Sequence, residues 1–181
     1  MQSNQTLITP ALIISILALL FTVFSFWWMN WRKGNLFVAT PRSYAAIGAM
    51  DGKMVLEFPF VFFNDGPIPI IVQNLQIVFL DEKASRPLAF MATVKQLGKH
   101  DESRSLATQF PVRGREALLI ICEFQRVPGG LLFEEKSYKL ELQGKLDRNK
   151  KWKRICVFDF HVTKQSAPSI NKQFIAHDNT A

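Results

Sequence analysis

Residues 54–64, MVLEFPFVFFN, carry an apolar side chain at every second position: Met54, Leu56, Phe58, Phe60 and Phe62. Successive side chains of a β-strand point to opposite faces of its sheet, so this period of two predicts a strand with one buried face. The turn at residues 64–67 ends the strand, because Gly66 accepts positive φ and Pro67 cannot donate a ladder hydrogen bond. Pro59 lies on the opposite face and predicts an edge strand or a bulge.

The same alternation recurs in four later segments. Their apolar positions are Leu75, Ile77 and Phe79; Leu118, Ile120, Cys122 and Phe124; Tyr138, Leu140 and Leu142; and Cys156, Phe158, Phe160 and Val162. Residues 36–40 and 88–97 are weaker strand candidates, and no amphipathic helix separates these segments. About seven strands predict an all-β fold, an antiparallel immunoglobulin-like β-sandwich over residues 32–163. A barrel with the same number of strands is the alternative.

An uncharged segment precedes this domain. Residues 1–30 contain no charged side chain, and residues 7–29 form a largely apolar run of 23. A helix of that length crosses about 30 Å of hydrocarbon, and Pro10 falls in its first turn, where a missing N–H costs little. We therefore predict a transmembrane helix over residues 7–31 after an N-terminal tail of residues 1–6. A cleaved signal peptide is disfavoured, because the run is long and lacks both a preceding basic residue and a small-x-small site.

Aromatic and basic residues follow the apolar run. Indole rings prefer the headgroup level and basic side chains anchor beyond it, which predicts a membrane interface at Trp27, Trp28, Trp31, Arg32 and Lys33. The 20 residues after the run contain Arg32, Lys33 and Arg42 and no acid, and this positive charge also predicts the orientation of the helix in the membrane. The positive-inside rule places the sandwich in the cytoplasm and the N-terminal tail outside the cell membrane. The opposite orientation is the alternative, because the difference is about two charges.

The C-terminal residues differ from the domain. Residues 164–181 lose the alternation, and Ser166-Ala167-Pro168-Ser169 has the composition of a boundary. We predict a flexible C-terminal tail over residues 164–181.

The layout resembles a group of uncharacterised bacterial single-pass membrane proteins with a β-sandwich. In them a strand ends in Asn-x-Gly and is soon followed by Pro and Ile, which matches Phe62, Phe63, Asn64, Gly66, Pro69, Ile70 and Leu75. The Asn-x-Gly feature is also similar to the water-stress and late-embryogenesis type 2 sandwiches. The resemblance covers about 20 residues. It implies a membrane-tethered sandwich and no catalytic residue.

Residues with catalytic or metal-binding chemistry are few and scattered. Asp159 and His161 share one strand face and could bind a metal, but a zinc site usually has four closely paired ligands. The two cysteines, Cys122 and Cys156, have the parity of core residues, and they could form a disulfide if the domain lies outside the cell. The remaining histidines are His100 and His177, and no Gly-rich phosphate loop occurs. We predict no catalytic, cofactor or metal site, and no enzyme.

One cluster of charge stands out. The segment KLDRNKKWKR, residues 145–154, sets six basic residues against Asp147, a local charge of +5 within a formal net charge of +7. On a hairpin tip it could bind anionic lipid headgroups or an acidic partner. A solvated turn whose lysines prevent edge-to-edge aggregation is the alternative. Nucleic acid is not expected, because no stacking platform accompanies the charge. The basic residues are Lys145, Arg148, Lys150, Lys151, Lys153 and Arg154.

Two functional hypotheses remain. The first is a non-catalytic accessory subunit of a larger membrane protein complex, anchored by its helix and contacting other subunits through the sandwich. The second is a membrane-tethered module that binds a lipid, peptide or envelope ligand through its loops. The loops long enough for this are residues 41–53, 82–87 and 99–115.

Overall fold

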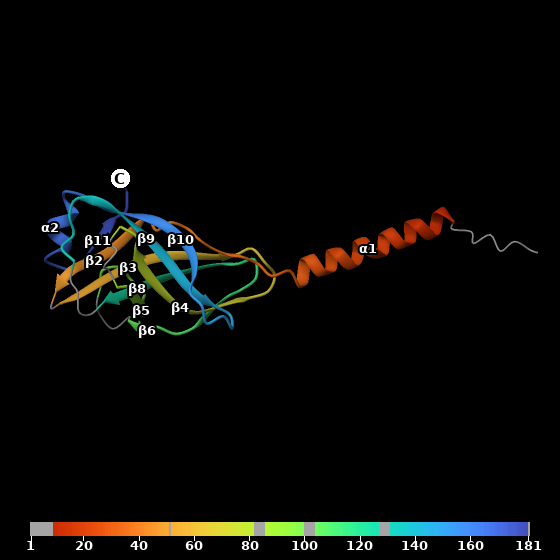
Figure 1. Cartoon of the computed structure of the whole chain (residues 1–181), viewed down its shortest axis with the longest axis horizontal. Helices are drawn as coiled ribbons and strands as arrows, with labels where there is room; N and C mark the ends of the chain where they lie inside the picture. The colour runs from red at the N-terminus through yellow and green to blue at the C-terminus, as the bar shows by residue number, and fades with distance from the viewer. Residues whose placement is uncertain (1–8, 51, 82–85, 100–103, 127–130, 181) are drawn as a thin grey trace, which may run out of the picture.

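The computed structural model describes residues 9–50, 52–81, 86–99, 104–126 and 131–180. Figure 1 shows helix α1 (Pro10–Asn30) projecting from one end of a β-rich domain. Proline occupies the first turn of α1, and no residue of the helix is buried. The helix is long and apolar enough to span a membrane. An all-β fold preceded by one N-terminal helix is therefore confirmed.

The domain contains eleven described strands, more than the seven predicted. They are β1 (Leu36–Val38), β2 (Ser43–Met50), β3 (Lys53–Asn64), β4 (Ile70–Phe79), β5 (Leu88–Val94), β6 (Ser105–Leu106), β7 (Phe110–Val112), β8 (Ala117–Arg126), β9 (Lys136–Leu146), β10 (Lys153–Val162) and β11 (Ile175–Asp178). All described pairings are antiparallel, in the order β10-β9-β4-β5-β8-β3-β2-β11. Short strands β1, β6 and β7 pair with β3, β5 and β4.

The sheet curls until its two ends face each other across the core. Phe58 of β3 lies 5.2 Å from Phe158 of β10, measured between ring centroids, and Tyr44 of β2 lies 4.6 Å from Phe160. The hydrogen-bonded ladder continues between the two halves through β4 and β5, which share two residue pairs. The domain thus has the two-layer packing of a sandwich and the continuous ladder of an open barrel, the two architectures that the sequence left open.

The predicted alternation of residues 54–62 is confirmed. Met54, Leu56, Phe58, Phe60 and Phe62 are all completely buried. The predicted inward positions of the other four alternating segments lie in β4, β8, β9 and β10, and most of them join the same core. Aromatic contacts dominate its centre, where Phe60 packs edge-to-face against Phe62, Phe124 and Phe158.

Strand β2 replaces part of a predicted loop. Residues 41–53 were expected to form a loop long enough to bind a ligand, but Tyr44, Ala45, Ala46 and Ile47 are all buried in a strand paired with β3. The chain at Gly98 lies over the outer side of Ala45 and Ala176, so both faces of β2 are covered. A strand covered on both faces loses the apolar–polar alternation, which is why the period gave no signal.

Pro59 was expected in an edge strand or at a bulge, but β3 is an interior strand. On the side away from β8, pairing with β2 ends at Glu57 and pairing with β1 begins at Phe62. Pro59 lies between these two ladders while facing Ile121 of β8. Its missing N–H therefore falls where none of the described strands pairs with β3.

The prediction of a flexible tail over residues 164–181 is contradicted for the described residues 164–180, which include a helix and a strand joined to the domain. Helix α2 (Ser166–Ile170) is followed by β11, which pairs with β2. Asn179, nearly buried, then accepts a hydrogen bond from the His161 N–H (2.8 Å) and donates to the carbonyls of Asp159 (2.8 Å) and Pro41 (3.0 Å). Ile170 is the one buried apolar residue among residues 164–180, and strand pairing and polar contacts hold the rest, so hydrophobic periodicity could not reveal this segment.

Candidate functional site

The junction between α1 and the domain is held by hydrogen bonds. Arg32 places its guanidinium 4.7 Å from the ring centre of Trp28 and donates to the Asp65 carbonyl (2.9 Å). An Asp65 carboxylate oxygen accepts from the Asn35 N–H (2.6 Å), and Arg115 donates to the Met29 carbonyl (3.0 Å). Arg32, predicted as a membrane anchor, therefore also joins the helix to the domain.

Asn64 is the centre of this junction. Its side chain is completely buried, its amide NH₂ donates to the carbonyls of Ile68 (2.8 Å) and Val112 (3.2 Å), and its oxygen accepts from the Gly66 N–H (3.0 Å). These bonds connect the end of β3, the following turn and β7. Sequence reasoning saw a strand-ending turn here and missed the structural role of the amide, which depends on residues distant in the chain.

Two glycines allow the backbones to meet at this point. A Cβ on Gly34 would overlap the amide nitrogen of Gly66 and the side-chain oxygen of Asn64, and a Cβ on Gly66 would overlap the nitrogen of Gly34. The segment leaving α1 thus passes directly over the Asn64 turn, and neither glycine has room for a side chain.

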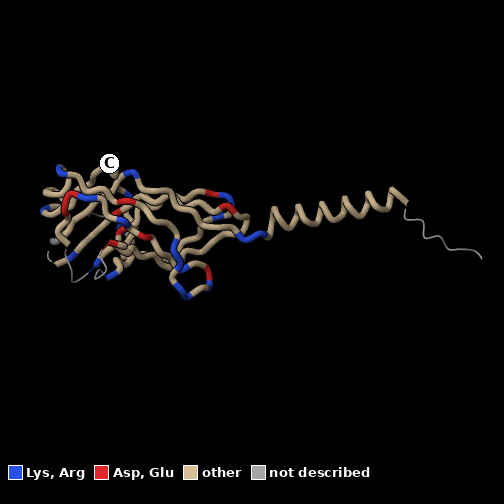
Figure 2. Tube along the Cα trace, turned by 45° about the horizontal axis from the view of Figure 1, so that its top comes forward, with Lys and Arg blue, Asp and Glu red and all other residues tan. Residues whose placement is uncertain are grey.

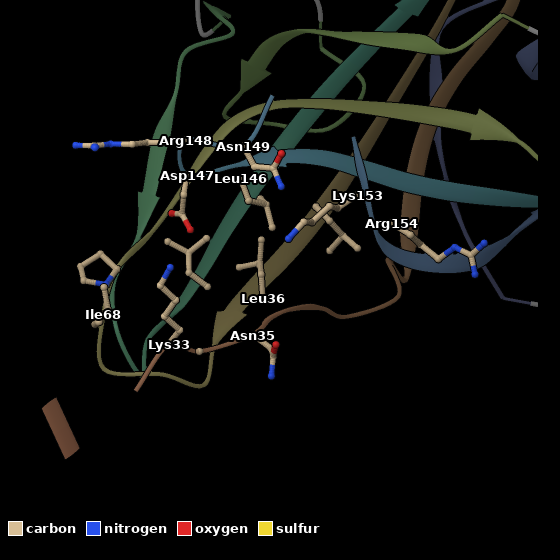
Figure 3. Close-up of a pocket in the computed structure, with 14 residues that line it drawn as sticks. Lys33, Asn35, Leu36, Ile68, Leu146, Asp147, Arg148, Asn149, Lys153 and Arg154 are labelled. Atoms are coloured by element: carbon tan, nitrogen blue, oxygen red, sulfur yellow. The ribbon is translucent and has the colours of Figure 1, made fainter. Parts of the chain in front are cut away.

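A pocket of about 670 Å³ opens beside the junction (Figure 3). Residues 33–36, which leave α1, form one wall, and the start of β4 with the preceding residues 68–69 forms a second. The β9–β10 turn forms the third. We call this space the junction pocket. Its walls combine the apolar residues Leu36, Ile68, Ile70, Leu146 and Ile155 with the charged residues Lys33, Asp147, Arg148, Lys153 and Arg154.

The structure divides the six residues of the predicted basic cluster. Figure 2 shows the turn that carries them on the half of the domain nearer to α1. Arg148, Lys153 and Arg154 line the junction pocket, whereas Lys150 and Lys151 are exposed outside it. Two are engaged elsewhere, because Lys145 stacks on Trp152 (4.7 Å) and Arg154 forms an ion pair with Glu141 (2.9 Å). The pocket adds Lys33, which lies 120 positions before Lys153 in the sequence.

An apolar surface lies on the outer face of β1, β3 and β8 near the junction. Phe37 pairs with Phe63, and Val61 pairs with Leu119, so their side chains are cross-strand neighbours. All four are exposed, from 37% for Val61 to 63% for Leu119. We call Phe37, Val61, Phe63 and Leu119 the outer patch. Its residues fall at the polar parity of their strands, so the sequence pattern could have indicated it.

A buried polar cluster lies farther along the same sheet face. Glu57 and Glu123 are cross-strand partners, and both are completely buried. Arg104 binds both oxygens of Glu123 (2.8 and 2.9 Å), and the Gly98 N–H donates to Glu57 (2.8 Å). The other Glu57 oxygen has no hydrogen-bond partner among the described residues. The pKa of Glu57 is raised to about 7, chiefly by burial and also by the Glu123 charge, while the Gly98 hydrogen bond and the Arg104 charge oppose the rise.

The other candidate chemical groups are not brought together. Cys122 and Cys156 are both free thiols, and burial raises the pKa of each, that of Cys156 to about 12, so both are protonated and poor nucleophiles. Asp159 is exposed, His161 is half-buried, and no group of three metal-binding side chains occurs within the described ranges. Burial lowers the pKa of His177. His100 lies outside the described residues.

Comparisons with known proteins leave the site to be interpreted from its own geometry. No protein-family model matches the chain, and no curated protein matches it. A solved structure of a protein from Archaeoglobus fulgidus aligns over 83% of this chain and 99% of its own chain, with 7% sequence identity and a TM-score of 0.34.

Replacing Asn64 with alanine should destabilise the domain by about 2–3 kcal/mol, because two buried carbonyls and one N–H lose their partner. The free energy of unfolding of the full chain in detergent, measured by denaturant titration, checks this. The exposed Gln173→Ala variant is the control and should change it by less than about 0.5 kcal/mol. Equal effects of the two substitutions would contradict the role assigned to Asn64.

Glu57 should make stability depend on pH. Its pKa is about 7 in the folded chain against an ordinary value of 4.5, so between these values the folded chain retains a proton that the unfolded chain has lost. The free energy of unfolding should therefore fall as pH rises from about 4.5 through about 7. Glu57→Gln should remove this component and flatten the curve measured from pH 5 to 8.5. The exposed Glu116→Gln should leave it in place, and parallel curves for wild type and Glu57→Gln would contradict the assignment.

Proposed function

We propose that this chain is a non-catalytic accessory subunit of a membrane protein complex. Its helix α1 lies in the bilayer, and its β-domain contacts a partner subunit through the outer patch. The observation that carries the proposal is the patch itself, four exposed apolar side chains from three adjoining strands on one face of the sheet. Contiguous apolar surfaces of this kind mark interaction sites more often than isolated apolar residues do.

The position of the outer patch supports a partner that is itself in the membrane. Phe63 directly precedes Asn64, the centre of the junction, so the patch begins where the domain meets α1. The helix presents exposed aromatic side chains at the same end, including Trp27 and Trp28. A neighbouring membrane subunit could therefore contact the helix and the patch together. The junction bonds hold the two surfaces in a fixed relation, which lowers the entropy cost of such binding.

The chemistry of the described residues supports a non-catalytic role. The cysteines are protonated core thiols, and the buried pair Glu57 and Glu123 is covered rather than open to a cleft. Gly98 donates to Glu57 of β3, and Arg104 binds Glu123 of β8. These contacts attach the chain at Gly98 and Arg104 to the two strands. The outer patch and the junction pocket remain accessible, and both are suited to binding.

The subunit proposal is tested by replacing two residues of the outer patch. The full chain is extracted from its native membranes in a mild detergent, separated by size, and analysed by mass spectrometry for proteins present at fixed stoichiometry. We expect the wild type to migrate in a complex and the Phe63→Ser/Leu119→Ser variant to lose that complex, because two central apolar contacts are removed.

The matched control replaces exposed apolar residues away from the patch. Leu80 and Val157 are each 42% exposed, so Leu80→Ser/Val157→Ser changes a similar kind of surface and should retain the complex. A wild-type chain that migrates alone, near 20.7 kDa plus its detergent, contradicts the subunit proposal. The loops would then become the place to search for a ligand. Of these, residues 41–50 form β2 and its approach, whereas 82–85 and 100–103 lie outside the described residues.

We also propose that the β-domain faces the cytoplasm. Arg32, Lys33 and Arg42 follow α1 without an acid before them, and two free thiols suit a reducing compartment. An epitope fused after Ala181 should resist protease in intact cells and be digested after permeabilisation. Digestion in intact cells would place the domain outside.

A further inference from the structure

The length of α1 fixes the depth of the junction pocket. The helix has 21 residues, which at 1.5 Å per residue span about 31 Å, close to the thickness of the hydrocarbon core. Lys33 follows the last helical residue, Asn30, by three positions, so it emerges at the level of the lipid headgroups. The pocket that Lys33 helps to form therefore opens within or directly beside the headgroup layer.

The charges around the pocket favour an anion. Figure 3 shows Lys33 and Lys153 extending into the pocket from different walls, Lys33 toward Asp147, whereas Arg148 and Arg154 point away from it. Neither lysine forms an ion pair with a described carboxylate. The acid in the pocket wall is Asp147, which also accepts a hydrogen bond from the Ile71 N–H (3.1 Å). Two lysines against one partly engaged carboxylate leave the pocket positive.

The apolar walls of the pocket require that its ligand also has an apolar part. Leu36, Ile70, Leu146 and Ile155 line the pocket beneath these charges, and they belong to four different segments of the chain. A small hydrated anion such as free phosphate would leave this apolar surface without a partner. An amphiphile with a phosphate at one end and hydrocarbon at the other satisfies both parts of the lining.

We propose that the junction pocket binds the headgroup of an anionic phospholipid, with its phosphate between Lys33 and Lys153. The glycerol and upper acyl region lie against the apolar walls. The proposal rests on α1 crossing a bilayer and is independent of any partner subunit. It differs from general attraction of the basic turn to a membrane, because it assigns the binding to two lysines from distant segments and excludes Lys150 and Lys151.

The test is lipid binding to the full chain in a mild detergent, followed by native mass spectrometry during titration with phosphatidylglycerol. We expect one tightly held phosphatidylglycerol per chain and at least tenfold weaker retention of phosphatidylcholine, whose headgroup is neutral overall. Lys33→Gln/Lys153→Gln should weaken phosphatidylglycerol binding by about tenfold or more, since each lysine near an anionic headgroup contributes appreciably to binding. Circular dichroism of the variant checks that it remains folded.

The matched control is Lys150→Gln/Lys151→Gln, which also removes two positive charges, both from the β9–β10 turn, and should change binding less than about twofold. Equal losses in both variants would show diffuse attraction and overturn the proposal, as would unchanged binding in the pocket variant. sn-Glycerol 3-phosphate is titrated in parallel. If it binds as tightly as the lipid, the pocket is a site for soluble phosphate compounds and the lipid proposal is wrong. Because the chain is studied alone, failure here leaves the subunit proposal untouched, and the reverse also holds.

Discussion

The buried amide of Asn64 is the interaction on which the functional end of the molecule depends. A buried amide without partners is costly, so its three hydrogen bonds require the end of β3, the turn at Ile68 and β7 to keep one arrangement. The segment leaving α1 then passes over this arrangement where Gly34 and Gly66 touch. Both accessible surfaces follow from it, because the junction pocket uses residues 33–36 around Gly34 and the outer patch begins at Phe63.

The junction pocket and the outer patch therefore both depend on the same arrangement around Asn64. A domain joined to a membrane helix by a loose linker would sample many orientations, and neither surface would keep a constant depth. Here Arg32 and Arg115 tie the end of α1 to the domain, so the lipid and the membrane subunit that we propose could bind at the same time. The buried Glu57 and Glu123 lie on the patch face but serve the fold, since their contacts fasten neighbouring chain to the sheet.

Prediction from the sequence succeeded where one physical signal dominated. The alternation at residues 54–62 identified β3 and its buried face, and the charge at residues 145–154 identified the basic turn. It failed for β2, which is covered on both faces, and for β11, which is held by pairing and by Asn179. The junction pocket could not be predicted, because joining Lys33 to Lys153 requires the tertiary fold. The same holds for the amide of Asn64, whose acceptor at Val112 lies 48 positions away.

The hydrogen bonds of Asn179 have a consequence for how the protein is made. They join β10 at one edge of the sheet to the start of β2 near the other, with help from Tyr44, which donates to the His161 carbonyl 117 positions later. During synthesis α1 leaves the ribosome first, whereas β11 and Asn179 emerge after every other described strand. Until then the edge of β2 is unpaired and lacks the Asn179 hydrogen bonds to β10, a state prone to pairing with other chains. With α1 in a bilayer, as we propose, tethering during this interval would keep nascent copies apart, so the helix that positions the finished protein would also protect the unfinished one.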